Sequence, residues 1–212
     1  MESTTTPMSG RRAQAARNDQ LILEAARDVF VNDPQAPIAT VAARAGVGIA
    51  ALYRRYRSKD ELLQRLAGDG LARYIAAAEA ALADGGAPWA AFARFLHRSL
   101  DAGAGSLTVR LAGTFTATEE LQRLGRTAFT VTGQLLDRTR AAGALRPDVE
   151  VGDISLLLEQ LQAVRIGDPH RSGQLRHRYL ALVLDALRLP PAAGPLPGPP
   201  PTPQELRRRY DG

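Results

Sequence analysis

Apolar residues recur every three or four positions along most of this 212-residue chain, the spacing that places them on one face of an α-helix. No segment shows the strict alternation of apolar and polar residues that is typical of a β-strand. The pattern therefore predicts an all-α protein. Its first helix covers residues 18–32, and Asn32-Asp33-Pro34 ends that helix.

Two short helices are predicted next, over residues 38–45 and 48–56, with Gly46 between them as a tight turn. Ser58 and Glu61 then have the spacing of a capping box, which marks the start of another helix. A short helix, a turn and a second short helix form the arrangement that lets a protein press one helix into a DNA groove.

The helical pattern continues through residues 58–83 and 87–189 and stops at a run of prolines. That run, PPAAGPLPGPPPTP, is incompatible with a helix or a sheet. The changes in pattern predict a flexible basic arm over 1–16, a helix-turn-helix DNA-binding domain over 17–63, a second helical domain over 64–189 and a disordered tail over 190–212.

Positive charge is concentrated where the helix-turn-helix pattern lies. Residues 11–59 contain nine arginines and lysines but four acidic residues, an excess that equals the net charge of +5 of the whole chain. Clustered basic residues attract the phosphates of nucleic acid. The charge therefore favours DNA as the partner of this segment.

An enzyme is the first alternative function, and the composition argues against it. The chain has no cysteine, and His97, His170 and His177 are scattered without metal-ligand spacing. No glycine-rich phosphate loop is present either. We therefore expect no enzymatic activity, no cofactor and no metal. Without a secretory signal or a membrane-length apolar run, we expect a cytoplasmic protein that does not contact membranes.

Several short elements at consistent spacing carry a family resemblance over about the first 70 residues. They are Ile22-Leu23, Ala25-Ala26, Phe30, Val41-Ala42, Ala45-Gly46-Val47, Leu52-Tyr53, Tyr56, Ser58-Lys59 and Glu61-Leu62-Leu63. With these elements the chain resembles the tetracycline-repressor (TetR) family of bacterial transcription regulators. The phrase Gly143-Ala144-Leu145-Arg146-Pro147-Asp148 adds a weaker likeness farther along.

The resemblance implies a two-domain homodimer whose N-terminal heads bind a palindromic operator in double-stranded DNA. It further implies a C-terminal cavity for a small-molecule effector, and a four-helix bundle formed by the last two helices and their mates. A repressor that leaves DNA on binding an apolar or aromatic effector is the resulting expectation. A ligand-independent regulator and an activator remain alternatives.

The third helix would then lie in the major groove with its N-terminal end on the base edges. The residues at that end, which carry no polar side chain, are Gly48, Ile49, Ala50 and Ala51. Apolar side chains can contact thymine methyls but cannot hydrogen-bond guanine or adenine. Direct polar readout would fall to Arg54, to Arg55 or to the N-terminal arm.

Tyr53 and Lys59 match positions that usually grip phosphates in the family, and Arg44 adds attraction that does not depend on sequence. Tyr56 is expected in the core of the head instead. Candidate effector contacts lie in or beside the apolar stripes of the second half: Trp89, Phe92, Phe95, Leu96, Arg110, Leu111, Phe115, Phe129, Leu158 and Gln162.

The last two helices are apolar on more than one face, so one face can pack against a second subunit. In the final helix, Leu180, Leu184 and Leu187 lie off the main apolar stripe. The candidate dimer contacts are Leu157, Leu161, Val164, Tyr179, Leu180, Val183, Leu184 and Leu187.

Overall fold

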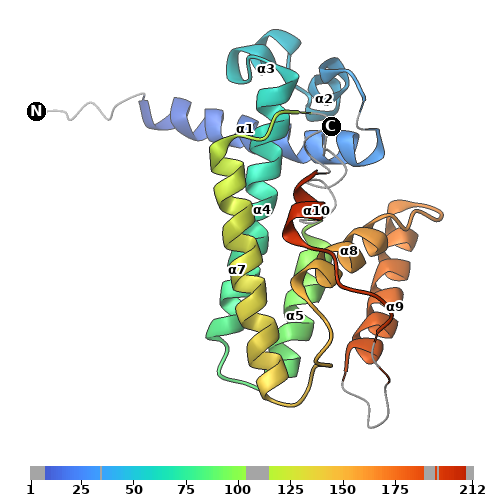
Figure 1. Cartoon of the computed structure of the whole chain (residues 1–212). Helices are drawn as coiled ribbons and strands as arrows, with labels where there is room; N and C mark the ends of the chain where they lie inside the picture. Colours follow the sequence, from blue (N-terminus) through green and yellow to red (C-terminus); the bar gives the residue numbers. More distant parts are fainter. Residues whose placement is uncertain (1–7, 34, 104–114, 189–193, 195, 209–212) are drawn as a thin grey trace, which may run out of the picture. The chain divides into compact units, whose positions relative to one another are not determined.

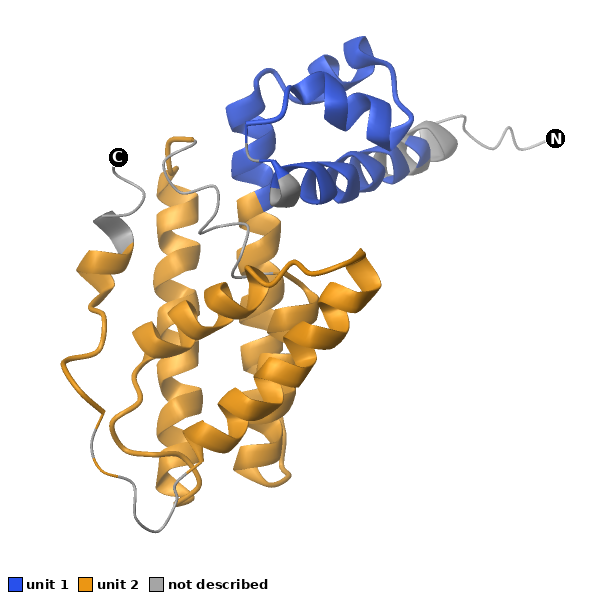
Figure 2. Cartoon of the chain, turned by 90° about the vertical axis from the view of Figure 1, so that its right-hand side faces the viewer, with its two compact units in different colours: residues 1–66 blue, residues 67–212 orange. Residues whose placement is uncertain are grey.

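The computed structural model of the chain describes residues 8–33, 35–103, 115–188, 194 and 196–208, and these residues form an all-helical fold (Figure 1). The prediction of an all-α protein is confirmed. The chain divides into two compact units, Met1–Leu66 and Ala67–Gly212 (Figure 2). No described helix is long and apolar enough to cross a membrane.

Unit 1 consists of α1 (Met8–Asn32), α2 (Ile38–Ala45), α3 (Ile49–Arg55) and the first turns of α4 (Lys59–Ala83). Gly46 ends α2 in the left-handed conformation, with φ of 67°, and its amide donates back to the last carbonyls of α2. A residue with a Cβ would be strained there. The core of the unit is fully buried and apolar, and includes Ala26, Phe30, Val41, Leu52, Leu62, Leu63 and Leu66.

The helix α1 begins at Met8 rather than near Asn18, so part of the predicted flexible arm is helical. Residues 8–17 lack the apolar period from which the start was predicted, but their alanines, arginines and glutamine are strong helix formers. The part of that arm before Met8 lies outside the described residues.

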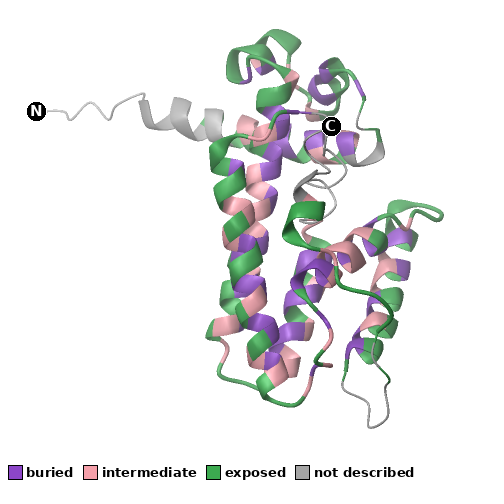
Figure 3. Ribbon diagram, viewed as in Figure 1, coloured by how far each residue is buried: buried purple, intermediate pink, exposed green. Residues whose placement is uncertain are grey.

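Unit 2 contains the rest of α4 together with five further helices in its described residues. They are α5 (Pro88–Asp101), α7 (Glu119–Ala141), α8 (Val151–Gln162), α9 (Pro169–Leu187) and α10 (Pro203–Arg208). Buried side chains from α4, α5, α7, α8 and α9 form one hydrophobic core, which Figure 3 shows as the inward faces of the helices. Tyr74 and Thr132 add a buried hydroxyl–hydroxyl hydrogen bond of 3.0 Å within it.

The proline-rich tail differs from the predicted disorder, because part of it folds back onto unit 2. Arg146 forms an ion pair with Asp148 (2.8 Å), and together they hold the tail backbone, Arg146 through the Gly194 carbonyl (2.9 Å) and Asp148 through the Leu196 amide (2.7 Å). These bonds lower the pKa of Asp148 to about 2. Prolines need no ladder of hydrogen bonds, so a few anchors suffice to place the segment.

Close contact with α8 fixes the tail farther along. Pro201 packs so tightly on Gly152 that a Cβ at this glycine would collide with the proline. Thr202 then caps α10, since its hydroxyl accepts from the Glu205 amide at 3.2 Å.

Candidate functional site

The outward residues of α3 and its flanks form one exposed surface on unit 1. Leu52 is fully buried and anchors α3, whereas Ile49 is 42% exposed and Tyr53 is 47% exposed. The predicted residues that the structure brings together here are Gly48, Ile49, Ala50, Ala51, Tyr53 and Arg54. The side chains around Ile49 are small, so the start of α3 can approach the base edges in a DNA groove closely.

Lys59 lies at the start of α4, next to this surface. Its ammonium group lies 5.1 Å from the ring centre of Phe30, a cation–π contact between the charged end of the side chain and α1. Ser58 caps the helix by accepting from the Glu61 amide at 3.1 Å, and Glu61 in turn accepts from the Arg57 amide at 2.7 Å. Ser58 thus forms its half of the predicted capping box, while Glu61 accepts from the amide one residue earlier, and the two bonds fix the start of the helix that carries Lys59.

Arg44 and Arg55 are predicted contact residues that both have partners within unit 1. Arg44, at the end of α2, forms an exposed ion pair with Asp28 at 3.1 Å. An exposed pair of this kind contributes little and separates easily. Arg55 is held more firmly, because Asp19 on α1 accepts from both its Nε (2.8 Å) and its Nη2 (2.9 Å).

Asp19 also accepts from the Tyr56 hydroxyl at 2.6 Å, so it binds two consecutive residues at the end of α3. Tyr56 is buried, as expected. The Arg55 bond holds the pKa of Asp19 below its usual value, and burial raises the pKa of Tyr56. Sequence reasoning did not single out Asp19, although an acidic residue within so basic a segment was an available signal.

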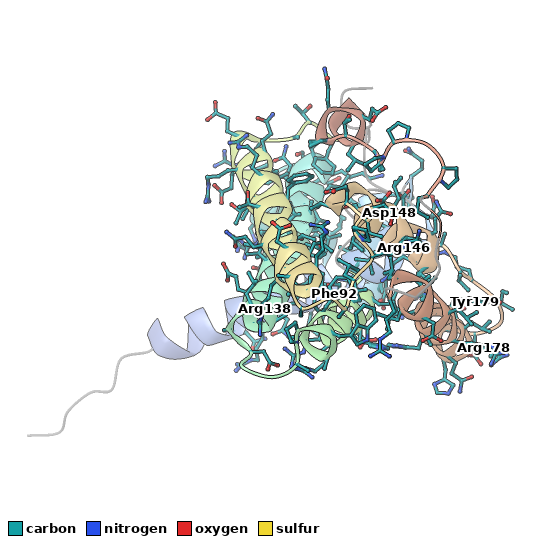
Figure 4. All side chains as sticks on the ribbon, turned by 60° about the horizontal axis from the view of Figure 1, so that its bottom comes forward. Phe92, Arg138, Arg146, Asp148, Arg178 and Tyr179 are labelled. Atoms are coloured by element: carbon teal, nitrogen blue, oxygen red, sulfur yellow. The ribbon has the colours of Figure 1, made fainter. Side chains whose placement is uncertain are left out.

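The candidate effector residues divide between the interior of unit 2 and its surface. Phe92, Phe95, Leu96 and Leu158 are buried, and Trp89 lies beside Phe92 with ring centres 5.7 Å apart. Figure 4 shows Phe92 within the helical bundle. Phe115 is buried too, but Phe129 is exposed and is not placed with them. Arg110 and Leu111 lie outside the described residues.

The described walls of this interior are in close contact. Residues of α5, α8 and α9 around Leu96, Leu158 and Leu180 enclose essentially no free volume. Gln162 is buried, and its amide donates to the carbonyl of Leu100, so it satisfies the end of α5. An effector would therefore have to displace side chains in this part of the unit.

The candidate dimer residues need correction in α9. Leu180, Leu184 and Leu187 are buried in the core of unit 2, so they are already covered within the chain itself. The opposite face of α9 is exposed, with Leu182 60% and Tyr179 39% accessible. Figure 4 shows Tyr179 and Arg178 at the outer side of this helix.

The other candidate dimer residues differ in how far they are exposed. Leu161 is buried, whereas Leu157, Val164 and Val183 are partly covered. Because α8 and α9 are both apolar on two faces, periodicity alone could not tell which face meets the core.

A chain of three titratable groups connects α5 to α9 away from these surfaces. The Nδ1 atoms of His97 and His177 are 3.1 Å apart, and His177 Nε2 is 2.6 Å from an Asp101 oxygen. Only one of the two Nδ1 atoms can carry the shared proton, so both rings cannot be cationic in this geometry. Burial and the neighbouring His177 lower the pKa of His97. Among the described residues, no group of three or more acidic or histidine side chains could hold a metal ion.

This arrangement predicts an acid-sensitive contact between α5 and α9. Because the pKa of folded His97 lies below the value of about 6.5 in an unfolded chain, stability falls as the pH drops through that value. Between pH 8 and pH 5.5, the melting temperature is expected to fall more for the wild type than for His97→Gln. His170→Gln changes a histidine at the exposed start of α9 and should show the same fall in melting temperature as the wild type. An equal fall in all three proteins would contradict the prediction.

Comparisons with known proteins agree for both units. Residues 22–66 match the family model described as bacterial regulatory proteins, tetR family, and residues 87–189 match that of the SbtR-like transcriptional regulator C-terminal domain. No curated protein matches the chain.

Solved structures with the same fold include three regulators described as TetR proteins. One from Mycobacterium vanbaalenii is 30% identical, with a TM-score of 0.57 and 84% of this chain and 99% of that chain covered. One from Streptomyces coelicolor is 26% identical, with a TM-score of 0.57 and coverages of 82% and 99%. LfrR from Mycobacterium smegmatis, in complex with proflavine, is 26% identical, with a TM-score of 0.56 and coverages of 78% and 95%.

Proposed function

Because the chain belongs to the TetR family of DNA-binding transcriptional regulators, we propose that it represses genes from a palindromic operator and leaves that operator when a small molecule binds unit 2. Regulators of this family are generally not enzymes. The proposal includes a homodimer, since two-fold symmetry of the protein matches a palindrome.

The observation that carries the DNA-binding part is the anchored and exposed α3. Buried Leu52 fixes this helix, and its outward side presents Ile49 and Tyr53 without any covering segment in the described part of unit 1. Tyr53 and Lys59 are proposed to contact phosphates, which fix the register of the protein on DNA. Ile49 is proposed to contact base edges through its apolar side chain.

Removal of the phosphate contacts tests this placement. Tyr53→Phe and Lys59→Ala are each expected to weaken binding to all DNA sequences, and Lys59→Ala should reduce the slope of log affinity against log salt by about 1. Gel-shift titrations at several salt concentrations measure both quantities. Arg98→Ala removes an exposed cation from α5 in unit 2 and serves as the matched control, with unchanged affinity expected. Unchanged affinity in both α3–α4 variants would contradict the docking.

The effector is proposed to be apolar or aromatic. Its support is the aromatic set of buried Phe92 and Phe95 with partly buried Trp89, together with the solved complex of LfrR with proflavine. Aromatic side chains of this kind commonly line small-molecule sites. An effector must both release the operator and stabilise the protein against heat, because binding to the folded state alone raises its stability.

One measurement distinguishes each alternative function from the proposed ligand-responsive repressor. A ligand-independent regulator would keep its operator affinity in the presence of every compound that stabilises the protein. An activator would raise, rather than lower, expression of a reporter gene placed behind the operator.

A further inference from the structure

The side chains of Arg54, Arg55 and Tyr56, at the end of α3, differ in how firmly hydrogen bonds hold them. Arg55 gives two parallel hydrogen bonds to Asp19, at 2.8 and 2.9 Å, and its guanidinium also lies 5.5 Å from the ring centre of Tyr56. The Asp19 side chain is 15% exposed, so its carboxylate depends on these partners in place of water. This bidentate geometry is the strongest form of ion pair between these residue types.

Arg55 is therefore poorly suited to a contact with DNA. Moving its guanidinium to a phosphate or a base would break both bonds and leave the mostly covered Asp19 carboxylate with the Tyr56 hydroxyl and the more distant charge of Arg65. While the pair persists, the charge of Asp19 also cancels that of Arg55 toward phosphates. Asp19 thus occupies one of the two arginines that the sequence offers for readout.

Arg54 is the other. It is exposed, and within the described part of the chain it makes no hydrogen bond or ion pair. On a helix, residues three and four apart lie on one face, so Arg54 shares a face with Ala50 and Ala51. Their short side chains leave room beside the arginine, and a guanidinium can bind the O6 and N7 atoms of guanine together.

We infer that Asp19 is a positioning residue that binds Arg55 away from the DNA, and that Arg54 is the α3 residue that selects a base by hydrogen bonding. The inference rests on the proposed function, since it requires α3 to enter the major groove. It assigns a different role to each of two adjacent arginines of the same chemistry.

The test begins with an operator obtained by selecting bound fragments from random DNA with the full-length wild-type chain. Arg54→Ala is expected to lower the affinity for that operator by roughly 10- to 100-fold and to erase the preference at one base pair of each half-site. Arg55→Ala is the matched control at the adjacent position. It should keep the selected sequence, because Arg55 contacts no base in this arrangement.

Asp19→Ala tests the positioning role. Release of Arg55 is expected to increase the salt slope by about 1 and to raise affinity for unrelated DNA. The double variant Asp19→Ala/Arg55→Ala should return the salt slope to the wild-type value, which a purely structural role of Asp19 would not produce. Thermal melts establish that each variant is folded before it is titrated; if Asp19→Ala unfolds, Asp19→Asn replaces it, with the same expectations.

The inference is overturned if Arg55→Ala changes the selected sequence, or if Arg54→Ala leaves that sequence unchanged. It is also overturned if the double variant keeps the slope of Asp19→Ala. A wild-type protein that selects no sequence at all would instead refute the proposed function, so the two failures are distinguishable.

Discussion

Arg138→Ala is expected to lower the free energy of unfolding by about 2–3 kcal/mol, which corresponds to a fall in Tm of roughly 5–10 °C in a chain of this size. Arg138 extends from α7 to the end of α4, where it donates to the carbonyls of Ala81 (2.9 Å), Leu82 (2.8 Å) and Asp84. The last carbonyls of a helix have no partner within the helix. Removing the guanidinium would leave these groups unsatisfied in a half-covered corner.

Two further variants separate this effect from the loss of a surface charge. Arg126→Ala removes an arginine from the exposed side of the same helix and should leave the Tm within about 1 °C of the wild type. Arg138→Lys keeps the charge but offers a single ammonium in place of the fork, so an intermediate Tm is expected. Equal melting of Arg138→Ala and Arg126→Ala would show that the corner does not depend on this residue.

Leu182→Asp is expected to dissociate the proposed homodimer and to reduce operator affinity by roughly 100-fold or more, because two linked heads bind a palindrome far more tightly than one. Leu182 is 60% exposed on the outer face of α9, beside Tyr179. A charge placed within an apolar interface would be buried without a partner. Sedimentation measures the subunit state, and gel shift measures the affinity.

Phe129→Asp is the matched control, since it places the same carboxylate at an exposed aromatic position on α7. This variant should remain dimeric and should retain the wild-type affinity. A dimeric Leu182→Asp protein with full affinity would contradict a dimer interface on the outer face of α9.

Much of the helical layout follows from local sequence. Gly46 fixes the turn between α2 and α3, because the backbone there has a left-handed conformation that glycine adopts without strain. Ser58 and Glu61 mark the start of α4. Signals of this kind act within a few residues and need no knowledge of the fold. The bounds of α2, Ile38–Ala45, were predicted in this way.

The features that local sequence did not predict depend on residues far apart in the chain. Asp19 and Arg55 are separated by more than thirty positions, and no periodicity links them. In α9 both apolar faces have helical spacing, and packing against α5 and α8 decides that Leu180 is inside and Leu182 outside. Interior faces of a two-sided helix are chosen by its neighbours and not by its own sequence.

The docked tail has a practical consequence for anyone who shortens this chain. A recombinant protein cut before Gly194, as a proline-rich end invites, would lose the backbone partners of Arg146 and Asp148 and uncover the bare backbone at Gly152. The Arg146 guanidinium and the Asp148 carboxylate, which precede α8, would then bind water in place of the tail backbone. The shortened protein should therefore aggregate more readily and be less stable, although the removed residues look dispensable in the sequence.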